Sequence, residues 1–181
     1  MSRRGGARSR GAFDVGLFQA DAGDAGDADA TDATDAATAR RAQVESGVTL
    51  EAAGVILFKH IYRIAPQALP LFSFGKVEGA AVNNALFESA ALKAHGKNVV
   101  ATVATVVGML SKLDELVPIL TKLGKRHVGY GVLPAHYDVV GEALLATISD
   151  ALGDGFTSEV KEAWTAVYGI VQKTMIGDNY N

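Results

Sequence analysis

Two histidines stand where helical patterns otherwise place apolar side chains. His127 closes a stripe that begins at Leu116, and His95 sits inside a second stripe that ends at Val106. Residues three or four positions apart share one face of a helix, so both imidazoles are expected to point inward. An imidazole that leaves water needs a partner. If the two helices face each other, one flat, apolar, metal-bearing ligand between them would serve both rings.

The four histidines of the chain do not fall in equivalent places. A single inward-facing histidine is more often a satisfied core residue than a ligand, but two on neighbouring helices favour a shared ligand. His60 lies one position before Ile61 of an apolar stripe, so it is expected to point sideways or outward. His136 lies in the first turn after Pro134, a solvated position. We therefore expect both to be surface residues.

The composition limits the classes of protein that fit. The chain has 181 residues, 49% of them hydrophobic, which is enough for one domain with a sizeable core. Its 17 basic and 20 acidic residues give no sign of a nucleic-acid partner. No apolar run reaches the roughly 18 residues of a membrane span. The absence of cysteine excludes disulfides and thiolate metal sites, and suits a reducing compartment such as the cytoplasm.

The first 41 residues differ from the rest. Residues 1–13 carry four arginines and no acid, which favours a disordered basic end, with an organelle-targeting peptide as the alternative. Residues 21–39 repeat aspartate among small residues and contain no large apolar side chain, so burial cannot offset the entropy of ordering them. We expect residues 1–41 to be a disordered low-complexity tail and residues 42–181 to be the folded domain.

The body predicts an all-α fold of six or so helices. Caps, prolines and glycines mark where these helices begin and end. No segment alternates between apolar and polar residues for long enough to suggest a strand. In chain order, the main helices are expected to run from Thr49 to Pro66, from about Ser89 to Leu110, from about Asp114 to Gly129, from Pro134 to Leu152, and from Thr157 to about Gly177. A short helix is expected to follow Pro66, and sharp turns argue against a simple up-down bundle.

Several fragments, in this order and spacing, resemble the globin family, and within it the neuroglobins and the plant non-symbiotic haemoglobins. The resemblance covers about residues 48–175. It implies the globin fold, a 3-over-3 sandwich of helices. The fragments are RIAPQALPLFSF at 63–74, LKAHG at 92–96, LGKRHVGYGV at 123–132, VGEALL at 140–145 and AWTAVYG at 163–169.

The resemblance also implies a cofactor, haem b, and a place for it. His127 would be the proximal ligand of the haem iron, as in globins generally, and His95 would face it from the distal side. Covalent c-type attachment is excluded because it needs cysteine. The apolar walls of the pocket would be Phe72 on the porphyrin, Leu123, Val132 and Tyr137 on the proximal and inner sides, and Phe58 and Val99 on the distal side.

Two departures from the family pattern stand out. Globins usually begin with a long helix that carries an inward tryptophan, but here the matching residues, about 38–47, are polar and contain none. The first helix is therefore expected to be short, loosely docked or absent. Gly96 follows His95 directly, and glycine costs up to about 1 kcal/mol inside a helix. That segment is expected to be adaptable, which is compatible with movement of His95.

The family leaves several functions open. His95 would either hydrogen-bond a gas ligand or bind the iron itself, and internal binding lowers the apparent affinity for external ligands. The leading prediction is reversible binding of dioxygen, and also of nitric oxide or carbon monoxide. One alternative is oxidation of nitric oxide to nitrate with electrons from a separate reductase. The other is a haem-free interaction or sensor domain. A zinc enzyme is disfavoured because zinc catalysis usually needs three protein ligands. The sequence leaves the oligomeric state open.

Overall fold

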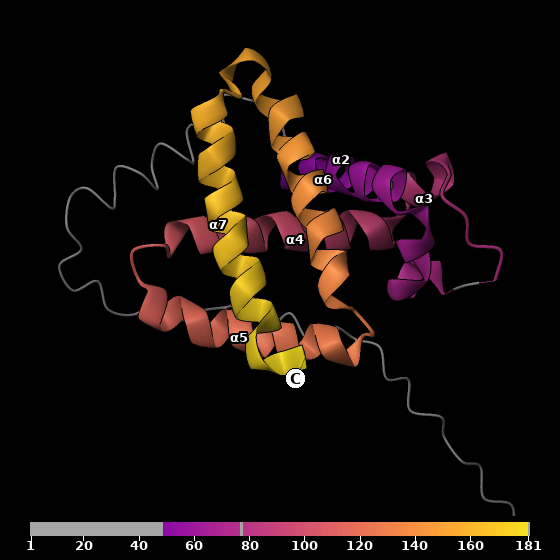
Figure 1. The fold of residues 1–181 in the computed structure, drawn as a ribbon. Helices are drawn as coiled ribbons and strands as arrows, with labels where there is room; N and C mark the ends of the chain where they lie inside the picture. The colour runs from indigo at the N-terminus through magenta and orange to yellow at the C-terminus, as the bar shows by residue number, and fades with distance from the viewer. Residues whose placement is uncertain (1–48, 77, 181) are drawn as a thin grey trace, which may run out of the picture.

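The computed structural model describes residues 49–76 and 78–180, and this part of the chain is helical without a strand (Figure 1). The all-helical class predicted from the sequence is confirmed. The predicted tail, residues 1–41, and the predicted short first helix, about residues 38–47, lie outside the described residues. The helices are α2 (Leu50–Ile64), α3 (Asn84–Glu88), α4 (Ala90–Gly108), α5 (Leu113–Gly129), α6 (Pro134–Leu152) and α7 (Ser158–Ile176).

Hydroxyl side chains begin three of the long helices. The Oγ1 atom of Thr49 accepts from Ala52 at the start of α2, and Ser89 and Thr157 cap α4 and α7 in the same way. Each such cap is worth about 1 kcal/mol. At the other end of α2, the chain leaves the helix one residue before Pro66 and enters a 3₁₀ turn, Pro66–Leu71. The predicted boundaries of the long helices therefore agree with the structure to within one or two residues.

The helices form two crossing layers. Figure 1 shows α6 and α7 as an antiparallel pair that passes over α4 and α5, while α2 packs against both α4 and α6. One core cluster joins α2, α4 and α6, and a second joins the end of α4 with α5, α6 and α7. Within the described residues, no helix is long and apolar enough to cross a membrane. The first cluster therefore fixes α4 against α2 and α6, and the second fixes the end of α4 against α5.

Two glycines allow α2 and α4 to cross with their backbones in close contact. Gly54 of α2 and Gly96 of α4 are both buried, and each lies against the backbone of the other. A Cβ atom built on Gly96 would come within 2.8 Å of the carbonyl carbon of Gly54, closer than real Cβ atoms come. The sequence suggested that Gly96 makes its helix adaptable. The structure supplies another reason for this glycine, because no side chain fits where α2 crosses α4.

Substitution of Gly54 by alanine is expected to lower the free energy of unfolding by about 1–3 kcal/mol, because the new methyl group forces α2 away from α4. The measurement is urea unfolding followed by circular dichroism. Gly169→Ala is the matched control, since this glycine lies within α7 and its built Cβ has nothing within 4 Å beyond its chain neighbours and the nearby backbone of its own helix. That change should raise stability by up to about 1 kcal/mol. Equal effects of the two substitutions would contradict the close crossing.

Candidate functional site

The two inward histidines lie on neighbouring helices, one near the start of α4 and one in the last turn of α5. Both are half-buried. Burial lowers the pKa of His95 below its ordinary value, and the nearby His127 lowers this pKa further. Burial also lowers the pKa of His127. Because the charge of His127 acts on His95, the two imidazoles share one region of the molecule, and both are mainly neutral near pH 7.

A hydrogen bond fixes the tautomer of His127. Its Nδ1 atom lies 2.9 Å from the carbonyl oxygen of Leu123. A carbonyl can only accept, so Nδ1 carries the proton and donates it. The lone pair of the ring is therefore on Nε2, the nitrogen turned away from the helix backbone. A neutral imidazole with one nitrogen held in this way is the form that ligates metals.

The turn after α5 brings Val132, another residue predicted for the site, beside His127. Gly131 adopts a positive φ of 82°, which a residue with a side chain rarely adopts. The chain then turns back, and the backbone N–H of Val132 donates to the carbonyl oxygen of His127 at 3.1 Å. Val132 and Leu123 are both half-buried and pack on the second core cluster.

Aromatic rings surround His95. Its ring centre lies 5.6 Å from that of Phe58, 5.5 Å from that of Phe72 and 6.0 Å from that of Phe74, each in an edge-on arrangement. Phe74 stacks on Phe72 at 5.3 Å. Val99, one turn further along α4, packs on the same core cluster. The structure thus brings the predicted distal residues together, and adds Phe74.

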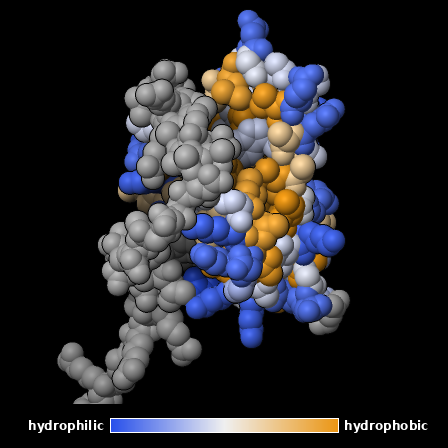
Figure 2. Space-filling model, turned by 90° about the vertical axis from the view of Figure 1, so that its left-hand side faces the viewer, coloured by the Kyte–Doolittle hydropathy of each residue, from blue (hydrophilic) through white to orange (hydrophobic). Residues whose placement is uncertain are grey.

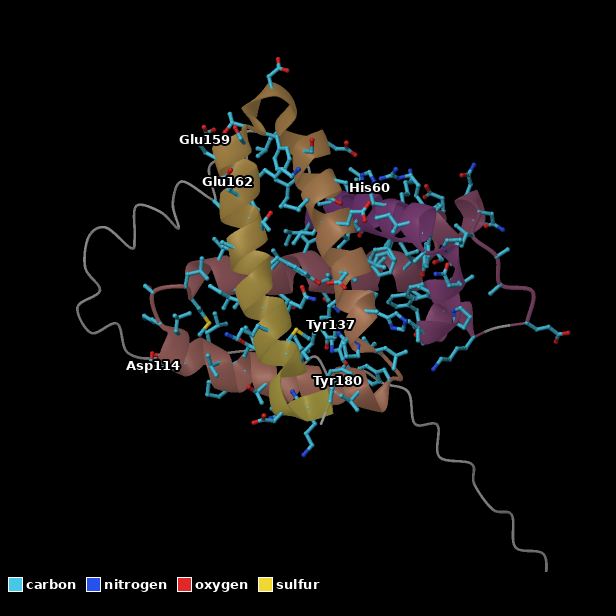
Figure 3. The ribbon with its side chains drawn as sticks, viewed as in Figure 1. His60, Asp114, Tyr137, Glu159, Glu162 and Tyr180 are labelled. Carbon is cyan, nitrogen blue, oxygen red and sulfur yellow. The ribbon has the colours of Figure 1, made fainter. Side chains whose placement is uncertain are left out.

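Tyr137 lies on the other side, next to His127. The two ring centres are 6.1 Å apart, and the Tyr137 hydroxyl lies 3.2 Å from the hydroxyl of Tyr180 (Figure 3). The Tyr168 hydroxyl donates to the backbone carbonyl of Tyr137 at 2.7 Å. Burial raises the pKa of Tyr137, and the bond to Tyr180 raises it further, so this phenol stays protonated.

Tyr180 was not predicted, because the chain was expected to fray near Gly177. α7 does end at Ile176, but residues Gly177–Tyr180 form a further 3₁₀ turn. Asn179 ties this turn to α5, since its Nδ2 atom donates to the carbonyl oxygen of Thr121 at 3.1 Å. The only signal in the sequence was an aromatic residue two positions beyond an aspartate, which is too weak to assign.

The other two histidines lie outside this group, but they are not freely solvated as expected. His60 is 17% exposed, and its Nε2 atom lies 2.8 Å from Asp150, so it links α2 to α6 (Figure 3). The Nδ1 atom of His136 accepts from the backbone N–H of Leu133 at the start of α6. Both are half-buried, and each has a hydrogen-bond partner. In residues 49–76 and 78–180, no three histidines or carboxylates gather as a metal site would require.

Comparison with known proteins adds independent information. A family model of the globins matches residues 56–175. The neuroglobin of Tetraodon nigroviridis is 30% identical over 122 residues, which cover 67% of this chain and 76% of that protein. Neuroglobin-1 of Oncorhynchus mykiss is 33% identical over the same shares of each chain. A flavohemoprotein of Bacillus subtilis is 35% identical over 68 residues, 38% of this chain and 17% of that protein.

The hydroxyl group of Tyr62 can be tested by a stability measurement. The Tyr62 hydroxyl is buried and has no hydrogen-bond partner among the described residues. Tyr62→Phe is therefore expected to leave the free energy of unfolding unchanged or to raise it by up to about 1 kcal/mol. Tyr168→Phe, the control, removes a made hydrogen bond and should cost about 1–2 kcal/mol. A loss above about 1 kcal/mol for Tyr62→Phe in urea unfolding would mean that its hydroxyl is paired.

Proposed function

The chain belongs to the globin family, and from that premise we propose that it binds haem b between α4 and α5. Through the haem it would reversibly bind dioxygen, nitric oxide or carbon monoxide. Globins are haem-binding proteins, and the residues present suit that cofactor. The observation that carries the proposal is the His127 imidazole, held neutral with Nδ1 on the carbonyl oxygen of Leu123 and Nε2 available to a metal.

The surroundings of the two histidines fit a flat, largely apolar cofactor. Phe58, Phe72 and Phe74 present ring surfaces on the side of His95, and Leu123 and Val132 present aliphatic ones on the side of His127. Such walls favour burial of a macrocycle, at roughly 25 cal/mol for each Å² of apolar surface removed from water. A haem held here would supply an iron atom able to bind a small gas molecule.

We propose that the two histidines act differently at this site. His127 would bind the iron from the proximal side, and the hydrogen bond to Leu123 keeps its ring in one orientation and makes Nε2 a better electron-pair donor. His95 controls the distal side. Its neutral ring, packed edge-on against three phenylalanines, either donates a hydrogen bond to a gas ligand or presents a nitrogen to the iron. We propose that His95 does the second in the resting protein, which would give a bis-histidine, six-coordinate state.

Removal of His127 tests the cofactor assignment. His127→Gly is expected to weaken hemin binding about 100-fold or more, because loss of partners that only orient a ligand already costs 10–100-fold. Free imidazole should restore binding, which a purely structural role of His127 would not allow. His136→Ala is the control and should bind hemin as the unaltered chain does. Undiminished hemin binding by His127→Gly, measured by titration in the Soret band, would contradict the assignment.

Substitution of His95 tests the resting state. If His95 occupies the iron for all but about 1% of the time, His95→Leu should speed carbon monoxide binding by about 100-fold. Stopped-flow mixing of the reduced, hemin-loaded protein with carbon monoxide measures this rate. His60→Gln serves as the control because His60 bonds to Asp150 instead. A rate equal to that of the unaltered protein would show that His95 does not bind the iron.

A further inference from the structure

The turn between α5 and α6 exposes apolar side chains beside the candidate site. Val128 is 38% exposed, Tyr130 43% and Leu133 58%, and Leu133 is the most exposed large apolar residue in the described part of the chain. We call these three residues the turn patch. The turn lies at the lower right of Figure 1, at the opposite end of α6 from the α6–α7 turn. Figure 2 shows that apolar side chains are also exposed on the opposite side of the molecule, so exposure alone does not single out this turn.

Tyr130 connects the turn patch to the candidate site. Its ring centre lies 6.1 Å from that of His127, although nearly half of the tyrosine is exposed. Val128, a second member of the patch, follows His127 directly in the chain. A molecule bound on the turn patch would therefore lie one side chain away from the proposed proximal ligand of the haem iron.

Backbone hydrogen bonds hold the turn patch in one shape. The N–H of Tyr130 donates to the carbonyl oxygen of His127 at 3.0 Å. The N–H of Gly131 donates to that of Val128, also at 3.0 Å. Together with the bond from Val132 to His127, these bonds engage three consecutive N–H groups of the turn. Because the backbone is already ordered, a partner that binds here loses little free energy to ordering it.

Basic residues border the turn patch on the side of α5. Lys122, Lys125 and Arg126 lie in the last two turns of this helix. Lys125 is three positions before Val128, so the two residues share a helix face. Residues 116–137 contain no carboxylate, in a chain whose net charge is −3. The positive charge at this end of α5 therefore runs against the balance of the whole protein.

Neighbouring elements change this local balance little. α6 carries Asp138, whose carboxylate accepts a hydrogen bond from Gln172 of α7. The C-terminal turn, which packs on α5, carries Asp178. Lys173, next to Gln172 on α7, adds a cation. In this region of the described structure the cations outnumber the carboxylates, so a negatively charged partner is favoured.

The occupant that fits this surface is a protein with acidic residues around an apolar centre. Tyrosine and arginine, both present here, are the residue types enriched where partners bind most strongly. Three exposed side chains are too few for a stable dimer of this chain, but they suit the small interfaces of transient electron-transfer complexes. We propose that an acidic electron-donor protein docks on the turn patch, held by Lys122 and Lys125. This proposal rests on the haem function above, because the electron needs an iron atom to receive it.

The step that such a complex carries out is the transfer of one electron. The reduced prosthetic group of the donor loses the electron, and ferric haem iron gains it and becomes ferrous. No bond forms or breaks, so the task of the protein surface is to bring the two centres close together. Ferrous iron is the form that binds dioxygen, so the donor would return an oxidised protein to its gas-binding state.

Cross-linking tests the docking without any need for haem. Flavodoxin, a small acidic flavoprotein, is the probe, and a carbodiimide joins its carboxylates to lysines in contact with them. In the full chain, with and without hemin, mass spectrometry should find the cross-links at Lys122 and Lys125. Leu133→Glu should reduce their yield about tenfold, because it places a carboxylate against an acidic partner. Leu152→Glu, a change at the 40% exposed leucine that ends α6, is the matched control and should leave the yield unchanged.

The rate of electron transfer gives a second readout. Stopped-flow mixing of reduced flavodoxin with the ferric, hemin-loaded chain follows reduction in the Soret band. Lys125→Glu should slow this reduction about fivefold at an ionic strength of about 0.02 M, and less at about 0.2 M, where salt screens the charges. Lys161→Glu, near the start of α7, changes the net charge equally and should have a much smaller effect. Dithionite alone should reduce all variants at the same rate.

Three results would overturn the proposal. One is a pattern in which Lys122 and Lys125 are cross-linked no more often than Lys161. Another is equal slowing by Lys125→Glu and Lys161→Glu, since net charge alone would then act. The third is a sedimentation coefficient that rises with the concentration of this chain and does not rise for Leu133→Glu, because a second copy would then cover the turn patch. A chain that cross-links at Lys125 but binds no hemin would refute the proposed haem function and not the docking.

Discussion

The hydrogen bond between the His127 imidazole and the carbonyl oxygen of Leu123 is the interaction on which the site depends. It selects one tautomer, fixes the ring in the last turn of α5 and leaves Nε2 as the lone-pair nitrogen. The turn that follows, with Gly131 at a positive φ, holds Val132 beside the same residue. A backbone carbonyl and a helix end thus orient a candidate metal ligand.

The opposite side of the site depends on a steric constraint. α2 and α4 meet at Gly54 and Gly96, where neither helix has room for a side chain. This contact places the start of α4, and with it His95, against Phe58 of α2 and the phenylalanines that follow Pro66. His95 is desolvated by these rings, which lowers its pKa and keeps it neutral. Helix packing therefore determines the protonation state of a candidate ligand.

Local signals in the sequence were enough to predict the long helices, because caps, prolines and apolar stripes act over a few residues. The globin family, recognised from fragments such as LKAHG and LGKRHVGYGV, is confirmed by the family match. Contacts between distant segments were not predictable in this way. The helix α3, the stacking of Phe74 on Phe72, the return of Tyr180 to Tyr137 and the pairing of His60 with Asp150 all depend on tertiary packing. The roles of His95 and His127 as ligands stay predictions.

The most direct measurement is the visible absorption spectrum of the full chain after reconstitution with hemin and reduction with dithionite under argon. A haem held between His127 and His95 predicts sharp, split visible bands, the mark of low-spin, six-coordinate iron. A single broad band would be consistent with haem bound by His127 and would contradict ligation by His95. The spectrum of free haem would contradict the site itself, because neither imidazole would then be bound to the iron.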